Sequence, residues 1–238
     1  MNARERMLGR LRAAAPAQVS DDDVTRLDAG IDLHYDSRRV ASPTPALVES
    51  MHAQLSASHA EVFRATERTW PALIAQRLQQ ANVKRLLLDT SRAECAALQQ
   101  ALPHSVATRS YDQPIEHWKA ELFDTIDAGF TVARSGLAST GTLIVAPDAG
   151  SPRTMSLVPP LHIALVYAHT LHADLHAAMR AEHWHAGMPT NLVMISGPSK
   201  TSDIQQTLAY GAHGPRELWV VIVEHRADNA GSTHGDAA

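Results

Sequence analysis

From Val83 onward, short apolar segments alternate with helical patterns, and this alternation constrains the fold more than any other feature. Several apolar segments contain almost no polar residue, as is typical of strands covered on both faces of a sheet. Strands that alternate with helices form mostly parallel sheets with right-handed crossovers. The sequence therefore predicts an α/β fold whose mostly parallel sheet is flanked by helices. The expected strands are 83–88, 105–108, 130–133, 142–146, 162–167, 191–195 and 218–223, and the expected helices between them are 91–100, 115–126, 170–182 and 201–210.

The first 45 residues differ from this pattern. Residues 3–14 predict an amphipathic helix with arginines on one side and Met7, Leu8 and Leu11 on the other. This helix is too apolar on one face to remain without a partner, so we expect it to pack on its own domain or on another protein. An exposed, Pro- and Ser-rich connector follows at 36–45.

Three regions are expected. They are an N-terminal helical arm and linker (1–45), an α/β domain (46–225) and a loose Gly/Ala-rich tail (226–238). The α/β domain should begin with helices over 46–66 and 71–80, the second of which has proline in its first turn.

Charge and cysteine content exclude several classes of protein. The 21 Lys and Arg residues are outnumbered by 25 Asp and Glu, which argues against a general nucleic-acid binder. The single cysteine, Cys95, permits no intrachain disulfide and no Cys-x-x-Cys pair. An iron–sulfur cluster needs about four cysteine ligands, and no Gly-x-Gly-x-x-Gly segment follows a predicted strand. We therefore expect no redox cofactor in this chain.

No segment resembles a signal peptide or a membrane span. The longest apolar runs have the length of strands and fall far short of the ~20 residues that cross a bilayer. The expected location is the cytoplasm.

The first candidate binding segment precedes the strand at 142–146. Glycine permits a close backbone approach to a ligand, and hydroxyls donate hydrogen bonds to anions. An ordinary tight turn explains the same residues. The candidate ligand-binding residues here are Ser139, Thr140, Gly141 and Thr142.

The second segment contains Arg153 and His162. Arg153 lies in a loop rich in Gly, Ser and Pro, where its guanidinium group could hold a carboxylate or phosphate through two hydrogen bonds. His162 begins an apolar strand after two prolines. It is either a ligand-binding residue or a hydrogen-bonded core histidine.

The third segment follows the strand at 191–195. It predicts a strand, a Gly-Pro turn and then a helix that begins near Ser202, which fits a capping box with Gln205. The N-terminus of such a helix would offer free amides to an anion at the edge of the sheet. A capped helix with no ligand is the alternative. The candidate ligand-binding residues are Ser196, Gly197, Pro198, Ser199, Lys200, Thr201 and Asp203.

Two further features are less specific. Residues 210–217 enter the last strand, so His213 and Arg216 would lie at the sheet edge opposite the Gly-Pro turn. His169, His172 and His176 would share one face of the helix expected at 170–182. The sequence fixes no acidic residue as a partner of these histidines, and a polar helix face explains the same spacing, so we expect no metal site.

Four segments in this order and spacing resemble the LUD-domain family. They cover roughly residues 129–224, and the Arg-rich N-terminal helix is also similar to the start of that family. The segments are Thr-Gly-Thr (140–142), Ser-Leu-Val-Pro-Pro-Leu-His-Ile (156–163), Ser-Gly-Pro-Ser-Lys-Thr-Ser-Asp-Ile (196–204) and Gly-Ala-His-Gly-Pro-Arg-Glu-Leu (211–218).

The resemblance implies a fold similar to ribose-5-phosphate isomerase, glucosamine-6-phosphate deaminase and the CoA transferases. It also implies a role in oxidising L-lactate to pyruvate beside two iron–sulfur partner proteins. The scarcity of cysteine in this chain agrees with clusters that reside in partners.

One residue departs from the family. Family members commonly have Glu immediately before Thr-Gly-Thr, whereas this chain has Ser139. A transferase mechanism that needs an acyl-accepting Glu would lack it here. Three functions remain open: an assisting subunit that binds a small carboxylate or a partner, an enzyme acting on a phosphorylated or CoA-linked metabolite, and a regulatory or scaffold protein.

Overall fold

The computed structural model describes residues 2–14, 20–39, 41–202 and 208–225. The chain divides into two compact units, and the boundary falls between Ala41 and Ser42. The first unit contains α1 (Ala3–Ala14) and α2 (Asp21–Asp36). The sequence predicted α1 but not α2. The second helix begins where the Ser20 hydroxyl accepts a hydrogen bond from the Asp23 amide (3.1 Å), and three aspartates in its first turn favour the helix dipole.

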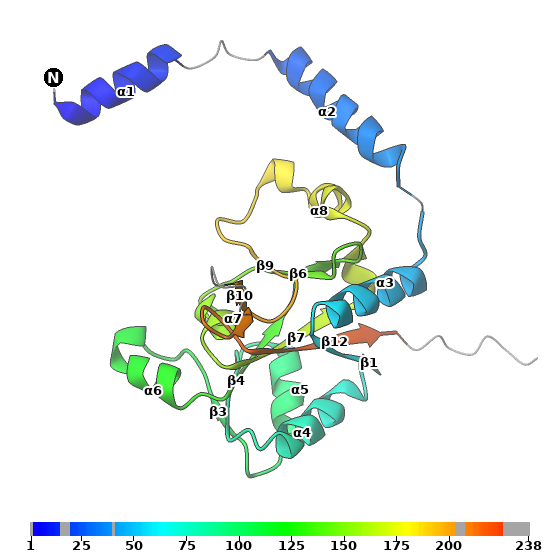
Figure 1. Ribbon diagram of the computed structural model, residues 1–238, viewed down its shortest axis with the longest axis vertical. Coiled ribbons are helices and arrows are strands. Elements are labelled where there is room, and N and C mark those ends of the chain that lie inside the picture. Colours follow the sequence, from blue (N-terminus) through cyan, green and yellow to red (C-terminus); the bar gives the residue numbers. More distant parts are fainter. Residues whose placement is uncertain (1, 15–19, 40, 203–207, 226–238) are drawn as a thin grey trace, which may run out of the picture. The chain divides into compact units, whose positions relative to one another are not determined.

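The second unit contains a parallel sheet that, in the described part of the chain, has six strands in the order β1-β12-β7-β4-β2-β3 (Figure 1). All of its pairings are parallel. The predicted α/β class is therefore confirmed. The strands are β1 (Glu61–Thr66), β2 (Arg85–Leu87), β3 (Ala107–Arg109), β4 (Ala128–Val132), β7 (Leu161–Tyr167) and β12 (Glu217–Glu224).

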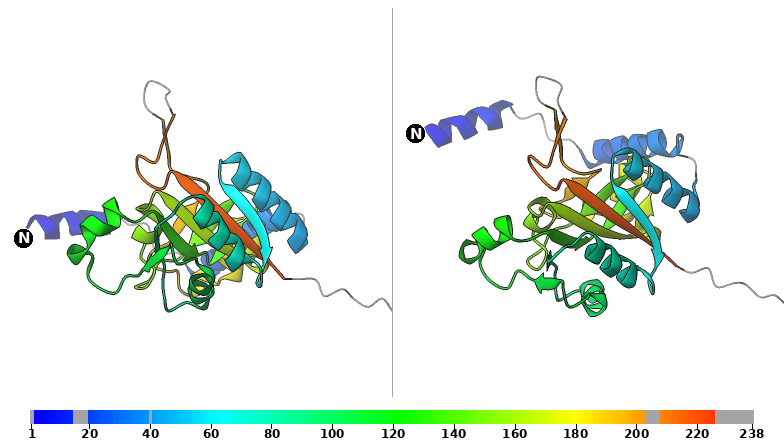
Figure 2. Two further views of the ribbon diagram at one scale, coloured as in Figure 1. Left: turned by 90° about the horizontal axis from the view of Figure 1, so that it is seen from below. Right: turned by 60° about the horizontal axis from the view of Figure 1, so that its bottom comes forward.

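Residues of the central strands alternate between two hydrophobic cores. On one face, Ile163 and Leu165 pack with residues of α4 (Trp70–Gln80) and α5 (Ala93–Ala101). On the other face, Ala164 and Val166 pack with α3 (Thr44–Ala57) and with a second sheet. Figure 2 shows the resulting layers. The continuous apolar runs in the sequence follow from this coverage of both faces.

The second sheet has the order β8-β5-β6-β9. Its strands are β5 (Ser135–Leu137), β6 (Thr142–Val145), β8 (Leu171–His172) and β9 (Val193–Ile195). The remaining described elements are η1 (Ile115–His117), α6 (Lys119–Asp124), α7 (Thr154–Leu157), η2 (Ala168–Thr170), α8 (Leu175–Ala181), η3 (Trp184–Ala186), β10 (Lys200–Ser202) and β11 (Leu208–Tyr210).

The helix predicted over 46–66 is wrong in its second half. The chain leaves α3 through His59, which has a left-handed backbone (φ 67°), and the Ala60 amide donates to the Leu55 carbonyl (3.0 Å). Residues 61–66 then pair with β12 at the sheet edge. Val62 and Phe63 suit such a strand, but the helical spacing of apolar residues continued through them.

Two other predicted helices are shorter than expected. The helix predicted over 170–182 begins only at Leu175, because the Asp174 carboxylate caps it by accepting from the Ala177 amide (2.8 Å). The helix predicted over 115–126 divides into η1 and α6 at the buried residue Trp118.

None of the helices in the described ranges has the length and apolar character needed to cross a membrane. The predicted tail (226–238) lies outside the described residues.

Candidate functional site

A chain of hydroxyl groups joins two of the predicted segments. Thr142 Oγ1 lies 2.7 Å from Thr140 Oγ1 and 2.8 Å from Ser196 Oγ, on the loop after β9. The antiparallel pairing of β6 with β9 brings these residues together across 54 positions of sequence. Ser139 is exposed beside them, and its amide donates to the Ala173 carbonyl (3.1 Å).

Two glycines let these loops approach the end of α3. Gly141 has φ +60°, and a Cβ there would lie 2.7 Å from Gln54 Cβ and 2.8 Å from the Leu55 nitrogen. Gly197 has φ +150°, and a Cβ would lie 2.8 Å from the Ser58 carbonyl oxygen. Both positions require glycine for conformation and for space. The two predicted segments thus meet at one place, the C-terminal end of α3.

The Gly-Pro loop is also tied to the segment before β12. The Ser199 amide donates to the Pro215 carbonyl (2.8 Å), and the Gly211 amide donates to the Ser199 carbonyl (3.0 Å). The expectation that residues 210–217 lie at the opposite sheet edge is therefore wrong. These residues pair with the loop because a β-hairpin returns the chain to it.

That hairpin replaces the helix predicted over 201–210. Residues 200–202 form β10 and pair antiparallel with β11, Thr201 opposite Ala209 (Figure 2). The serine- and threonine-rich segment resembled a helix start, but backbone pairing with distant residues prevailed over local propensity. Ser202 lies in a strand rather than at a helix cap, so the described residues 200–202 supply no helix N-terminus. Asp203 and Gln205 lie outside the described residues.

An inner cavity of about 200 Å³ lies behind the Gly-Pro loop. It is lined by polar groups from three predicted segments together with apolar side chains of β9 and β12. Its lining residues are Ser156, Leu157, His162, Val193, Met194, Ile195, Ser196, Gly197, Pro198, Ser199, His213, Gly214, Pro215 and Leu218.

His162 is one of two buried polar residues that line this cavity, and Ser156 is the other. His162 lies on β7, opposite Gly129 of β4 and Leu218 of β12, and only 1% of its surface is exposed. Burial lowers the pKa of its imidazole to about 3, so the ring is neutral at pH 7. Its Nε2 lies 2.8 Å from Thr131 Oγ1. When Thr131 donates this hydrogen bond, Nδ1 carries the proton and becomes the donor of the ring.

An outer hollow of about 490 Å³ adjoins the cavity and shares Met194, Ser196, Gly197 and Pro198 with it. Its remaining lining residues are Ala57, Ser58, His59 and Lys200. The lysine is exposed and supplies a positive charge. Among the described residues, neither hollow is lined by a carboxylate. We call the cavity and the hollow together the loop site.

Arg153 is not part of the loop site. Its side chain is exposed and lines neither hollow, although its carbonyl accepts hydrogen bonds from the Ser156 amide (3.2 Å) and hydroxyl (3.1 Å). Sequence reasoning missed Ser58 and His59 because no pattern marks the end of α3 as a neighbour of the Gly-Pro loop. It noted His213 but did not place it at the site.

The histidines expected on one helical face lie on three different elements: His169 in η2, His172 in β8 and His176 in α8. Within the described ranges, no group of three or more His, Cys, Asp or Glu side chains is arranged to hold a metal ion.

The fold and site define an α/β protein with a glycine-rich loop site beside a parallel sheet, and comparisons with known proteins identify its family. The family model of the LUD domain matches residues 48–223. The protein belongs to the LUD-domain family, as the resemblance in its sequence predicted.

Relatives match over different lengths. An uncharacterized protein of Neisseria meningitidis is 34% identical over 227 residues, which cover 94% of each chain. The lactate utilization protein C of Oceanobacillus iheyensis is 21% identical over 93% of this chain and 98% of its own length. That of Halalkalibacterium halodurans is 34% identical over 110 residues, or 44% of this chain and 48% of its own.

A solved structure supports the fold. The crystal structure of a DUF162 family protein from Deinococcus radiodurans aligns with a TM-score of 0.59 and 22% sequence identity. The alignment covers 77% of this chain and 99% of that one. The expected likeness to sugar-phosphate isomerases and CoA transferases stays a prediction.

Proposed function

We propose that this protein is a component of a system that oxidises L-lactate to pyruvate, and that it binds a small carboxylate at the loop site. Electrons would pass through iron–sulfur partner proteins and not through this chain. The observation that carries the ligand proposal is the lining of the site. Hydroxyls, histidines and Lys200 surround it without a carboxylate among the described residues.

The size of the cavity favours a small ligand. Its volume of about 200 Å³ is below the ~300–1,000 Å³ of sites that enclose drug-sized molecules. A three-carbon hydroxy or keto acid matches this space. Its carboxylate would face the hydroxyl of Ser196, on the side toward the outer hollow that Lys200 lines, and its apolar end would face Leu218.

The chemistry of Cys95 supports the placement of the iron–sulfur clusters in partner proteins. The side chain is 1% exposed, and burial raises the pKa of its thiol to about 11. Metal ligation and thiol redox chemistry both need the thiolate, which is scarce at pH 7 with such a pKa. Cluster ligands would therefore come from partner proteins.

Deletion and affinity isolation test the role in lactate oxidation. A strain without this protein should fail to grow on L-lactate but grow normally on pyruvate, which bypasses the oxidation. Tagged protein from lactate-grown cells should retain iron–sulfur proteins, identified by mass spectrometry and iron content. Normal growth on lactate together with no iron–sulfur protein retained would overturn the proposal.

Thermal stabilisation tests the ligand. Saturating L-lactate or pyruvate, at about 100 times its dissociation constant, should add about 2.7 kcal/mol to the free energy of unfolding. Lys200→Ala should raise that constant about tenfold with little loss of stability, because the lysine is exposed. Arg153→Ala removes another exposed positive charge outside the site and is the matched control. A response to phosphate or coenzyme A alone would instead indicate an enzyme of phosphorylated or CoA-linked metabolites.

A further inference from the structure

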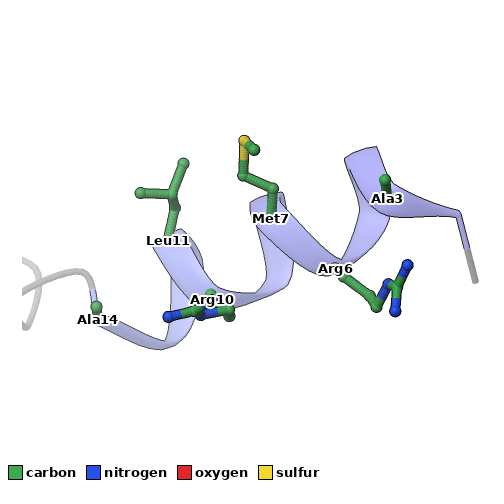
Figure 3. Close-up of a pocket in the computed structure, with 6 residues that line it drawn as sticks. All are labelled: Ala3, Arg6, Met7, Arg10, Leu11 and Ala14. Atoms are coloured by element: carbon green, nitrogen blue, oxygen red, sulfur yellow. The ribbon is translucent and has the colours of Figure 1, made fainter.

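The first helix of the arm has an apolar face with exposed side chains. No residue of α1 is buried, and the side chains of Met7 and Leu11 are 67% and 63% exposed. Figure 3 shows them projecting from one side of the helix, with Arg6 and Arg10 turned away from them. Four arginines against Glu5 make this helix strongly basic.

The second helix of the arm has the opposite charge and a matching stripe. Val24, Leu27 and Ile31 recur at helical spacing, and Leu27 and Ile31 are 59% and 48% exposed. No residue of α2 is buried. Six aspartates against Arg26 make the helix strongly acidic, and Asp28 and Asp32 fall beside the stripe at the same helical spacing.

These helices need a partner to be stable. A 12-residue helix is marginal in water, and α1 contains Gly9 in its middle, which costs about 1 kcal/mol relative to alanine. Packing of an amphipathic face supplies most helical stability in proteins. The stripe of each helix must therefore meet another apolar surface.

We propose that the arm is a dimerisation element in which α1 of one copy packs against α2 of a second copy, and the reverse. Charge complementarity selects this occupant, because an arginine-flanked apolar stripe meets an aspartate-flanked one. A two-fold arrangement makes the contact twice. It brings four helices around one shared apolar core. A pair of helices from a single chain would leave one side of each stripe exposed to water.

Wild-type protein should therefore have twice the chain mass of 25.8 kDa in light scattering coupled to size exclusion. Ile31→Glu places a charge within the stripe, at its C-terminal end, and should weaken the dimer at least tenfold. Leu33→Glu makes the same change two residues away, on the opposite side of the helix, and should leave the dimer intact. Leu33 is 71% exposed, so neither variant disturbs a packed residue.

Charge reversal distinguishes packing of α1 on α2 of a second copy from packing of α1 on α2 of the same chain. Arg6→Glu with Arg10→Glu gives an arm with two acidic helices, and Asp28→Arg with Asp32→Arg gives a basic α1 with an α2 of reduced negative charge. Each variant alone should be less dimeric than the wild type, and an equimolar mixture should regain the dimer mass.

Three results would overturn the proposal. The first is a monomeric wild type, which indicates pairing within the chain or a different protein as partner. The second is equal dimerisation of the Ile31→Glu and Leu33→Glu variants. The third is an equimolar mixture of the two charge variants whose mass stays below that of the dimer. Circular dichroism and denaturation of each variant establish that the larger unit stays folded.

Discussion

Replacing Gly129 by alanine should lower the free energy of unfolding by about 3 kcal/mol, a large loss for one methyl group. Gly129 lies in β4 between β2 and β7, and a Cβ there would lie 2.1 Å from the carbonyl oxygen of Met155. No side-chain rotation relieves this overlap, because the clashing atom belongs to the backbone of α7. Urea denaturation measures the loss.

The same substitution should also damage the loop site. The short helix α7 carries Ser156 and Leu157 into the inner cavity. An alanine at 129 must displace α7 from the sheet, so stabilisation by L-lactate or pyruvate should fall. Gly187→Ala is the control, because it lies in the same unit of the chain and a Cβ there meets nothing within 4 Å. A loss below about 1 kcal/mol at position 129 would show that α7 adjusts at little cost.

The core strands were predictable because burial on both faces leaves a continuous apolar run. Residues 162–167 and 218–223 have such runs, and both became central strands of the large sheet. The edge strand β1 was not predicted, because half-buried residues at 61–66 also fitted a helical spacing. Local pattern and tertiary pairing disagree most at such edges.

The site was predictable in its parts but not in its arrangement. The glycine and hydroxyls of 196–199 marked one segment that lines the site. Those of 139–142 marked a loop that lines neither hollow but contacts the site through the Thr142–Ser196 hydrogen bond. Their meeting depends on the pairing of β6 with β9, which no local pattern specifies. The helix expected after Lys200 was wrong, and Arg153 lies outside both hollows. Both outcomes depend on how distant segments pack.

These corrections change the electrostatics of the proposed site. A helix N-terminus would have supplied several amides and a partial positive charge. The hairpin supplies neither, so the attraction for an anion depends on Lys200 and on hydroxyl donors. The buried histidine contributes hydrogen bonding without charge at pH 7.

Acidification should destabilise the wild type more than a His162→Gln variant. The pKa of His162 is about 3 in the folded protein and about 6.5 in the unfolded chain. Between these values the unfolded state binds one more proton than the folded state, so stability rises with pH and falls as pH is lowered from 6.5 toward 3. From pH 7 to pH 5, this residue should cost about 2 kcal/mol.

The difference between the two proteins isolates His162, because the other titrating groups, including the partly buried His172, are common to both. Glutamine retains a hydrogen-bonding group opposite Thr131. Urea denaturation at several pH values measures how the free energy of unfolding of each protein changes with pH. Equal slopes for the wild type and the variant would show that the imidazole reaches water or a charged partner. In the protein without ligand, His162 stays neutral from pH 8 to pH 5, so its imidazole offers an incoming anion a hydrogen bond and no charge.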